Sequence, residues 1–192
     1  TFNPPHIGHF KIAREAVDSF GLDMVFFVPS FIPPHKDPKG VIDSYHRSKM
    51  TSMLIEGEPK FVLSDYEISK KTVSYSIDTI RHFETEFPGT KFYFIIGSDA
   101  FYFIDTWKEY QKVLSIIDFI IYERRGYPRE KISAKFPGKS GIYWIENRYI
   151  SISSSDIRKK PPSAALEEDV GAKIAGYIRQ NRLYEGHENE AS

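Results

Sequence analysis

Two histidines near the start of the chain are the residues best suited to chemistry. His6 and His9 stand three residues apart in the run TFNPPHIGH, with Gly8 between them, at the mouth of an amphipathic helix predicted from about Phe10. The first N–H groups of a helix are unpaired and its dipole is positive there, so this position favours an anion. Gly8 lets a phosphate approach the backbone closely, and two imidazoles can donate hydrogen bonds to phosphoryl oxygens. The spacing indicates nucleotide phosphate chemistry, although a bare H-x-G-H match also arises by chance in unrelated chains.

A serine-rich segment near the other end of the chain is the second strong signal. Residues 151–158 read SISSSDIR, and Ser153 and Asp156 have the spacing of a capping box, with Asp in place of the usual Glu. The segment could therefore be only a well-capped helix. Its hydroxyls and the N–H groups of a helix start, with Arg158 one turn in, would also hold a triphosphate.

The elements that must position these motifs are amphipathic helices alternating with continuously apolar strands. We expect five helices. The first runs from about residue 10 to 20, the second begins at a cap at Asp43 or Ser44, and the third runs from a cap at Ser74 through Phe87. The last two are expected at 153–159 and 166–182. We expect strands at 24–28, 61–63, 92–96, 116–122 and 142–145. This alternation is typical of an α/β fold with a doubly wound parallel sheet flanked by helices, here with a small C-terminal helical part.

The predicted sheet also predicts where a ligand binds. Ligands in such folds lie beyond the carboxyl ends of the strands, and polar motifs follow the predicted strand ends at 33–36, 97–99 and 124–126. We expect a single domain over residues 1–185 and a flexible polar tail at 186–192. Residues 128–141 are poor in motifs, which indicates a variable surface excursion.

Composition excludes several classes of function. Lys+Arg and Asp+Glu both number 26 in the 192 residues, and this zero net charge argues against a general nucleic-acid binder. The chain has no cysteine, which excludes disulfides, thiolate zinc sites and cysteine nucleophiles and fits a reducing cytoplasm. No apolar run approaches the roughly 18–20 residues of a membrane span. We expect a cytoplasmic protein without nucleic-acid or membrane partners, and homo-oligomer formation stays open. Because the chain begins with Thr1 at the motif itself, we expect a first strand before it.

Together the two motifs resemble the paired signatures of the nucleotidyltransferase superfamily related to class I aminoacyl-tRNA synthetases. Within it the chain is similar to the bacterial nicotinate-nucleotide adenylyltransferases. Three further stretches carry that resemblance, namely IPPHK at 32–36, VSYSIDT at 73–79, and FIIGSDA at 94–100 followed by Thr106-Trp107. The similarity covers nearly the whole chain in consistent order, and five ordered motifs are far more specific than any one of them.

The resemblance implies a Rossmann-like fold, a Gly-Gly pair between the expected first strand and Thr1, and a reaction. The 5′-phosphate of nicotinate mononucleotide would attack the α-phosphorus of ATP in line, releasing pyrophosphate and forming nicotinate adenine dinucleotide. Such a reaction needs positioning and charge neutralisation rather than a covalent protein nucleophile. Mg²⁺ is expected as a cofactor on ATP, held mostly by phosphates and water.

The resemblance also assigns roles to residues. His6, His9 and Arg158 would be the catalytic set. Those assigned to ATP are Thr1, Phe2, Gly8, Lys36, Gly97, Asp99, Arg124, Ile152, Ser154 and Ser155. For the mononucleotide, Trp107 would stack on the pyridine ring, while Ser76 and backbone groups near Trp107 and Lys108 would hold the carboxylate. Outside these motifs, Trp107 would be read as core packing, Asp99 as a helix cap, and Lys36 and Arg124 as surface charges.

The chain departs from the family pattern at a few positions. Asn3 stands where the family usually has Asp, Ser76 replaces Thr, Ser98 replaces Ala, Lys108 replaces an aromatic residue or His, and Arg125 replaces Pro. Two alternatives stay open: a sibling transferase that prefers nicotinamide mononucleotide or another small phosphate ester, and a non-catalytic nucleotide-sensing module. The stretch Ser74–Thr79 and the spacing from Asp99 to Trp107 argue against phosphopantetheine as the substrate. The intact catalytic set speaks against a sensor. The neutral charge and the absence of an anticodon-binding extension speak against a tRNA-binding synthetase fragment.

Overall fold

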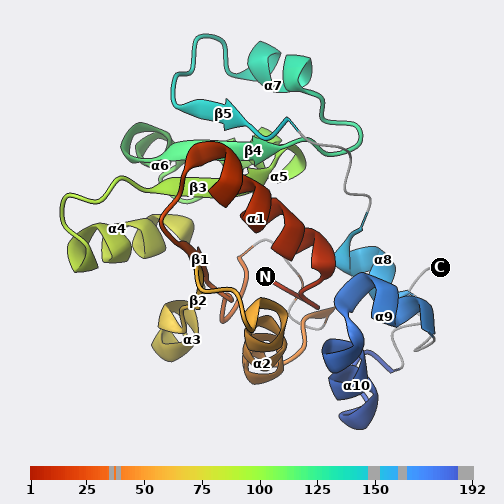
Figure 1. Ribbon diagram of the computed structural model, residues 1–192. Helices are drawn as coiled ribbons and strands as arrows, with labels where there is room; N and C mark the ends of the chain where they lie inside the picture. Colours follow the sequence, from red (N-terminus) through yellow and green to blue (C-terminus); the bar gives the residue numbers. More distant parts are fainter. Residues whose placement is uncertain (35–36, 38–39, 147–151, 160–163, 186–192) are drawn as a thin grey trace. The chain divides into compact units, whose positions relative to one another are not determined.

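The computed structural model describes residues 1–34, 37, 40–146, 152–159 and 164–185. The chain forms two compact units, each with its own parallel sheet (Figure 1). Unit 1 contains Thr1–Val17, Leu22–Ser74 and the chain from Ile152 on, and unit 2 contains Asp18–Gly21 and Tyr75–Ser151. The predicted α/β class is confirmed. The single domain over 1–185 stays a prediction, and the tail at 186–192 lies outside the described residues.

The sheet of unit 1 consists of two short parallel strands, β1 (Val25–Phe27) and β2 (Phe61–Leu63). Helix α1 (Ile7–Phe20) begins three residues earlier than predicted, so that its first turn includes Gly8 and His9. The apolar face of α1 provides four buried side chains, Ile12, Ala13, Ala16 and Val17. The helix therefore has the amphipathic packing that its sequence predicts, and its N-terminus carries the histidine motif.

The C-terminal helices of unit 1 pack on α2 (Ser44–Ile55), which Asp43 caps by accepting from the N–H of Tyr45 at 2.7 Å. They are α8 (Ser154–Arg158), α9 (Ala164–Val170) and α10 (Ala172–Gln180). Figure 1 shows α10 beside α2. Their shared core consists of Met50, Ile157, Leu166, Val170, Ile174, Ala175 and Ile178.

One continuous helix over 166–182 was expected, and this prediction is wrong. Gly171 has φ +85°, a value that side-chain-bearing residues rarely adopt, and it separates α9 from α10. A further short helix, α3 (Tyr66–Lys70), was not predicted.

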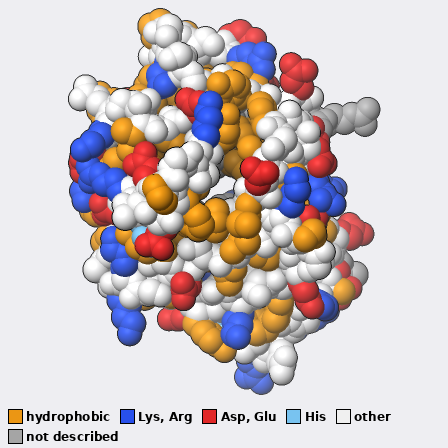
Figure 2. All heavy atoms as spheres, turned by 60° about the vertical axis from the view of Figure 1, so that its left-hand side comes forward, with side chains coloured by type: hydrophobic (Ala, Val, Ile, Leu, Met, Phe, Trp, Pro, Cys, Tyr) orange, Lys and Arg blue, Asp and Glu red, His pale blue; other side chains and the backbone are white. Residues whose placement is uncertain are grey.

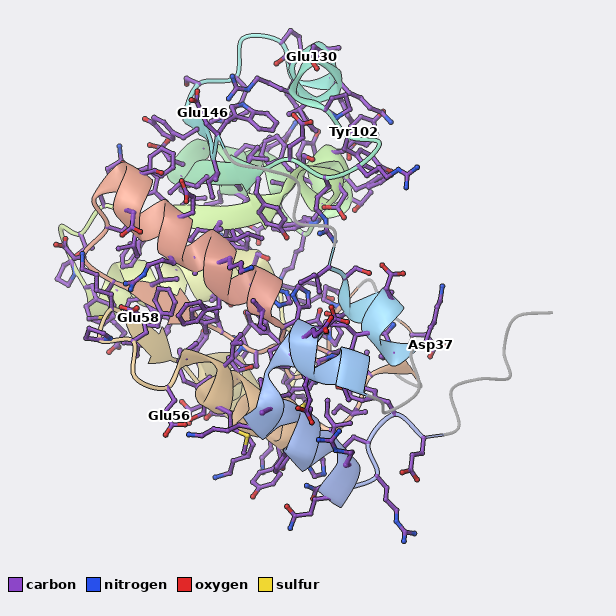
Figure 3. The ribbon with its side chains drawn as sticks, turned by 45° about the vertical axis from the view of Figure 1, so that its right-hand side comes forward. Asp37, Glu56, Glu58, Tyr102, Glu130 and Glu146 are labelled. Carbon is purple, nitrogen blue, oxygen red and sulfur yellow. The ribbon has the colours of Figure 1, made fainter. Side chains whose placement is uncertain are left out.

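Two ion pairs connect helices of unit 1. Arg14 of α1 pairs with Glu58 at 2.6 Å, and the Glu58 side chain is only 6% exposed. Lys173 of α10 pairs with Glu56, the C-cap of α2, at 2.6 Å between two exposed side chains. Figure 3 labels both carboxylates. Exposed pairs add little stability, so we expect the half-buried pair of Arg14 and Glu58 to matter more.

Unit 2 is built on three parallel strands in the order β3-β4-β5. They are β3 (Tyr93–Gly97), β4 (Asp118–Tyr122) and β5 (Ile142–Trp144), and β3 and β4 are in register from Tyr93 opposite Asp118 to Gly97 opposite Tyr122. The helices are α4 (Ser76–Glu86), α5 (Ser98–Tyr102), α6 (Tyr110–Ile116) and α7 (Arg129–Lys135), with a 3-10 turn at Ile104–Thr106. The core consists of Ile77, Ile80, Ile96, Phe101, Ile104, Val113, Ile117, Phe119, Ile121 and Ile132.

Three predictions about helices are wrong. Ser74 does not cap α4, since Tyr75 is its N-cap and the Ser74 hydroxyl instead accepts from the N–H of Phe31 at 2.9 Å. Helix α4 ends at Glu86 rather than at Phe87, which is its C-cap and is 42% exposed. The expected surface excursion at 128–141 contains α7, whose Ile132 is buried in the core of unit 2.

Lysine contacts also hold α7 to its neighbours. Lys135 donates to the carbonyl of Tyr102, which Figure 3 labels, at 2.5 Å, and to Asp105 at 2.9 Å. On the face drawn in Figure 2, acidic and basic side chains are interspersed rather than gathered by sign. In the part of the chain that the structure describes, no helix has the length and apolar character to span a membrane.

Candidate active site

The two histidine rings of the N-terminal motif stack on each other. Their centroids lie 3.7 Å apart with an interplanar angle of 32°, and His6 is buried. The backbone N–H of His6 donates to Nδ1 of His9 at 3.2 Å. Because Nδ1 accepts this bond, the neutral imidazole of His9 carries its proton on Nε2. His9 therefore offers a hydrogen-bond donor from the first turn of α1.

Phe2 supports His9 from the other side. The ring of Phe2 meets that of His9 edge-on at 4.9 Å and lies 5.8 Å from Phe27 of β1. The backbone of Phe2 is left-handed, with φ +53°, which is uncommon for a residue with a side chain. The predicted phosphate-loop residues Thr1 and Phe2 thus belong to the same structure as the histidines. We call Thr1–His6 the N-terminal loop.

The serine-rich motif forms α8 and docks on the N-terminal loop. The Ser153 hydroxyl accepts from the N–H of Asp156 at 3.1 Å, which confirms the predicted cap. The Ser154 hydroxyl donates to the carbonyl of Pro4 at 2.9 Å, across 150 residues of sequence. Arg158 donates through Nη1 to the carbonyl of Asn3 at 2.8 Å. A guanidinium has five N–H donors, so this contact leaves others for a phosphate.

The structure therefore brings together most of the residues expected to bind phosphate. His6, His9, Ser154 and Arg158 all lie on the N-terminal loop or on the elements joined to it. Ser155 is exposed beside Arg158, and Ile152 packs against the C-terminal core. Lys36 lies outside the described residues.

Sequence reasoning missed Arg47, which organises the backbone around this site. Arg47 is 1% exposed and donates to three carbonyls from different segments: to Ile42 from Nε at 3.0 Å, to Thr1 from Nη1 at 2.9 Å, and to Phe31 from Nη2 at 3.0 Å. Burial lowers the pKa of Arg47, yet a guanidinium stays charged in proteins. The sequence did carry one signal for its burial, since Arg47 lies three positions before the core residue Met50 and so shares a face of the helix with it.

Ser30 was also missed, and it follows β1 at the end where a parallel sheet binds ligands. It is 8% exposed, and its hydroxyl makes no hydrogen bond to any described residue. Buried polar atoms are nearly always hydrogen-bonded, so this hydroxyl is an unusual feature of the part of the chain that the structure describes. A serine in a Pro-rich loop carries no sequence signal of this kind.

In unit 2, Gly97, Asp99 and Arg124 meet at the carboxyl ends of β3 and β4. A Cβ on Gly97 would lie 2.5 Å from Oδ1 of Asp99 and 3.1 Å from the hydroxyl of Tyr122. Arg124 lies over the Tyr122 ring, with its Nε 3.8 Å from the Asp99 carboxylate, and is only 22% exposed. Arg124 is therefore not a simple surface charge.

The substitution of Ser98 for the family's Ala has a clear structural effect. Ser98 is fully buried, and its hydroxyl accepts from the backbone N–H of Arg124 at 2.8 Å. This bond ties the segment after β4 to the end of β3. It thereby fixes the backbone from which the Arg124 side chain extends.

The residues assigned to the mononucleotide also lie in unit 2. Trp107 is half-buried, and its ring packs edge-on against Phe94 of β3 at 5.6 Å. Lys108 lies over the ring of Tyr75, which precedes Ser76, and pairs with Asp78 at 3.6 Å. The structure thus joins Lys108 to the start of α4.

The hydrogen bonds around Trp107 indicate which backbone N–H could donate to the carboxylate of the mononucleotide. The N–H of Trp107 already donates to the carbonyl of Ile104 at 2.9 Å. The N–H of Lys108 makes no hydrogen bond within the described chain. Of the two backbone groups that the sequence suggested, that of Lys108 is therefore the better placed to bind an anion.

We expect Gly97→Ala to displace the Asp99 carboxylate, because the new methyl group would occupy its position. The role expected for Asp99 is to accept from the ribose hydroxyls of ATP, and losing one such charge-assisted hydrogen bond should raise the apparent KM for ATP roughly tenfold. Steady-state kinetics measures this. Gly176→Ala, in α10 with open space around the new Cβ, is the matched control and should leave the KM unchanged. Equal KM values in the two variants would contradict the assignment of Asp99.

The sequence and the fold can be compared with known proteins. The sequence model of the cytidylyltransferase-like family matches residues 1–160. The chain belongs to this family. As a cytidylyltransferase-like protein it has the Rossmann-like α/β fold that the sequence predicted, and it is a nucleotidyltransferase.

Individual relatives of this cytidylyltransferase-like protein carry a narrower name. A probable nicotinate-nucleotide adenylyltransferase of Clostridium novyi is 40% identical over 167 residues, covering 83% of this chain and 82% of the relative. A protein of the same name from Lactiplantibacillus plantarum is 34% identical, covering 96% and 85%.

A solved structure agrees with these relatives. The Plasmodium falciparum nicotinic acid mononucleotide adenylyltransferase complexed with NaAD superposes with a TM-score of 0.81 at 25% identity, covering 96% of this chain and 93% of the neighbour.

Proposed function

We propose that this protein transfers the adenylyl group of ATP to nicotinate mononucleotide, giving nicotinate adenine dinucleotide and pyrophosphate, in NAD biosynthesis. The observation that carries the proposal is the stacked pair of His6 and His9 at the start of α1, with Arg158 held on the same N-terminal loop. The names of the relatives support the same reaction.

The chemistry requires no covalent intermediate on the protein. An oxygen of the mononucleotide 5′-phosphate forms a bond to the α-phosphorus of ATP while the bond from that phosphorus to the bridging oxygen breaks. Negative charge grows on the bridging oxygen, and pyrophosphate leaves with the electron pair. The protein supplies orientation and donors for that charge.

Each group of the ATP side has a role in this proposal. Nε2–H of His9, with His6 stacked against it, donates to the α-phosphoryl oxygens. Arg158 and the hydroxyls of Ser154 and Ser155 bind the β- and γ-phosphates, supported by Lys36 and Ile152. Thr1, Phe2 and Gly8 shape the phosphate loop, and Gly97, Asp99 and Arg124 bind the adenosine part.

ATP enters as its magnesium complex in this proposal. Within the described residues no group of three or more His, Cys, Asp or Glu could hold a metal ion. A magnesium ion that is held by phosphate oxygens and water fits this set of residues, and it would neutralise charge on the leaving pyrophosphate. The cytoplasmic location and a homo-oligomeric state stay predictions.

On the mononucleotide side, we assign Trp107 to stacking on the pyridine ring. The N–H of Lys108 and the hydroxyl of Ser76 bind the carboxylate. The Lys108 ammonium adds positive charge near that group, although Asp78 already pairs with it. Such donors favour the acid over the amide, because a carboxylate accepts two charge-assisted hydrogen bonds.

The proposal is tested by mixing the full-length protein with ATP, Mg²⁺ and either nicotinate or nicotinamide mononucleotide, and following pyrophosphate. We expect pyrophosphate to be released when ATP and nicotinate mononucleotide are present together. Faster release with nicotinamide mononucleotide would instead support the sibling transferase. No release with either compound would contradict adenylyl transfer.

We expect Trp107→Ala to raise the apparent KM for the mononucleotide about twofold to tenfold, because stacking on an aromatic ring contributes about 0.5–1.5 kcal/mol. Affinity for ATP, measured by calorimetry with a non-hydrolysable analogue, should stay within twofold of the wild type. Trp144→Ala is the matched control, since Trp144 lies on β5 beneath Arg129. A comparable loss of ATP affinity in Trp107→Ala would contradict a specific role for the mononucleotide.

A further inference from the structure

The side chain of Asn3 joins three segments of unit 1. Asn3 is 1% exposed, and its Nδ2 donates to the carbonyl of Gly40 at 2.8 Å. Its Oδ1 accepts from the N–H of Ile42 at 3.3 Å and from the hydroxyl of Tyr184 at 3.1 Å. Gly40 and Ile42 lie at the end of residues 29–42, which we call the Pro-rich loop, and Tyr184 lies beyond α10. One amide therefore connects the N-terminal loop to both.

The backbone of Asn3 makes a fourth contact, which links this amide to the phosphate site. Its carbonyl accepts from Nη1 of Arg158 at 2.8 Å. The same residue therefore holds the Pro-rich loop and Tyr184 through its side chain and Arg158 through its main chain. A shift of Asn3 would move the guanidinium directly, since a hydrogen bond of this length tolerates little displacement.

We propose that Asn3 and Tyr184 are positioning residues for adenylyl transfer: through their hydrogen bond, the end of the chain holds the N-terminal loop, and with it Arg158, in the geometry that ATP requires. This inference rests on the proposed function and deepens it. Neither residue need touch a substrate, because both act through Arg158.

The amide of Asn3 is chemically suited to this position in a way that a carboxylate is not. It donates to Gly40 while it accepts from Ile42 and Tyr184, so both of its polar atoms are used. A carboxylate could accept the last two bonds but has no proton for the Gly40 carbonyl, so two oxygens would face each other in a buried site. Burial raises the pKa of Tyr184, so its hydroxyl keeps the proton that it donates.

A pair of tyrosine variants tests the proposal with one atom removed in each. Tyr184→Phe removes the hydroxyl that reaches Asn3. Tyr177→Phe removes a hydroxyl that bonds the His46 ring at 2.8 Å and likewise joins the C-terminal part to the rest of unit 1. We expect Tyr184→Phe to lower kcat/KM for ATP roughly threefold to tenfold, the range of one buried hydrogen bond. The KM for the mononucleotide should not change, and Tyr177→Phe should stay within twofold of the wild type in both constants.

A second set of measurements does not depend on turnover. Affinity for a non-hydrolysable ATP analogue should fall in Tyr184→Phe and in Asn3→Asp but not in Tyr177→Phe. Hydrogen exchange at the amide of Ile42 should speed up in Asn3→Leu, which cannot accept its bond. Combining Asn3→Asp with Tyr184→Phe should cost less than the sum of the two single changes, because both break one network.

The outcomes separate this inference from the proposed function. A wild-type protein that binds the ATP analogue but releases no pyrophosphate would contradict adenylyl transfer, while the binding series would still decide the role of Asn3. Equal behaviour of Tyr184→Phe and Tyr177→Phe in ATP binding and turnover would overturn the inference. So would strict additivity of the Asn3 and Tyr184 changes.

Discussion

Replacing His9 by alanine should reduce turnover by about 10²-fold or more, which is what removal of one donor to a transition state typically costs. His9 lies in the first turn of α1 with Nδ1 engaged by the backbone of His6, so Nε2–H is the donor that the variant removes. The ring also packs against Phe2, so the folded state of the variant should be checked by circular dichroism.

The measurement is the steady-state rate of pyrophosphate release at saturating ATP and mononucleotide. His82→Ala is the matched control, because His82 lies on α4, outside the histidine motif, and its ring packs against Phe83. We expect that control to retain at least half of the wild-type rate. A loss of turnover below threefold in His9→Ala would contradict a role for this histidine in the reaction.

The largest effect on stability is expected for Arg47→Met. The substitution keeps the bulk of the side chain but removes donors from the carbonyls of Thr1, Phe31 and Ile42. Each buried carbonyl left without a partner costs about 1–3 kcal/mol, so the free energy of unfolding should fall by about 3 kcal/mol or more. Urea unfolding followed by far-ultraviolet circular dichroism measures it.

Two further variants sharpen this prediction. Arg47→Lys keeps the charge but cannot reach three carbonyls with one ammonium group, so it should recover only part of the loss. Arg81→Met removes an arginine whose ion pairs with Glu109 and Asp78 are largely exposed, and it should change the unfolding free energy far less. Equal losses in Arg47→Met and Arg81→Met would contradict the role of Arg47 in holding these segments.

The sequence predicted those elements that depend only on residues close together in the chain. The strand at Phe61–Leu63 was predicted with its observed bounds, because a short apolar run between polar residues has few other interpretations. The start of α8 was also predicted, since a cap depends on residues three positions apart. The single helix over 166–182 was wrong because the core residues Ile174 and Ile178 continue the apolar spacing across Gly171.

The contacts that complete the candidate site could not be predicted in this way. Ser74 is of a good capping type, yet its hydroxyl bonds Phe31, a residue 43 positions away. Arg47 and Tyr184 bond the N-terminal loop across 46 and 181 positions. Motifs selected the residues that we assign to phosphate, but the residues that hold those motifs in place are defined only by tertiary structure. Lys36, which the motifs also select, lies outside the described residues.

The docking of α8 on the N-terminal loop has a consequence for how the protein is made. Pro4 and Ser154 are joined across 150 residues, so the part of the site that we assign to phosphate contains both early and late segments of the chain. The strands and helices of unit 2 lie between them and can fold while synthesis continues. The N-terminal loop cannot form its contacts with α8 and Tyr184 until these residues have left the ribosome. ATP binding should therefore be among the last properties that the nascent chain acquires.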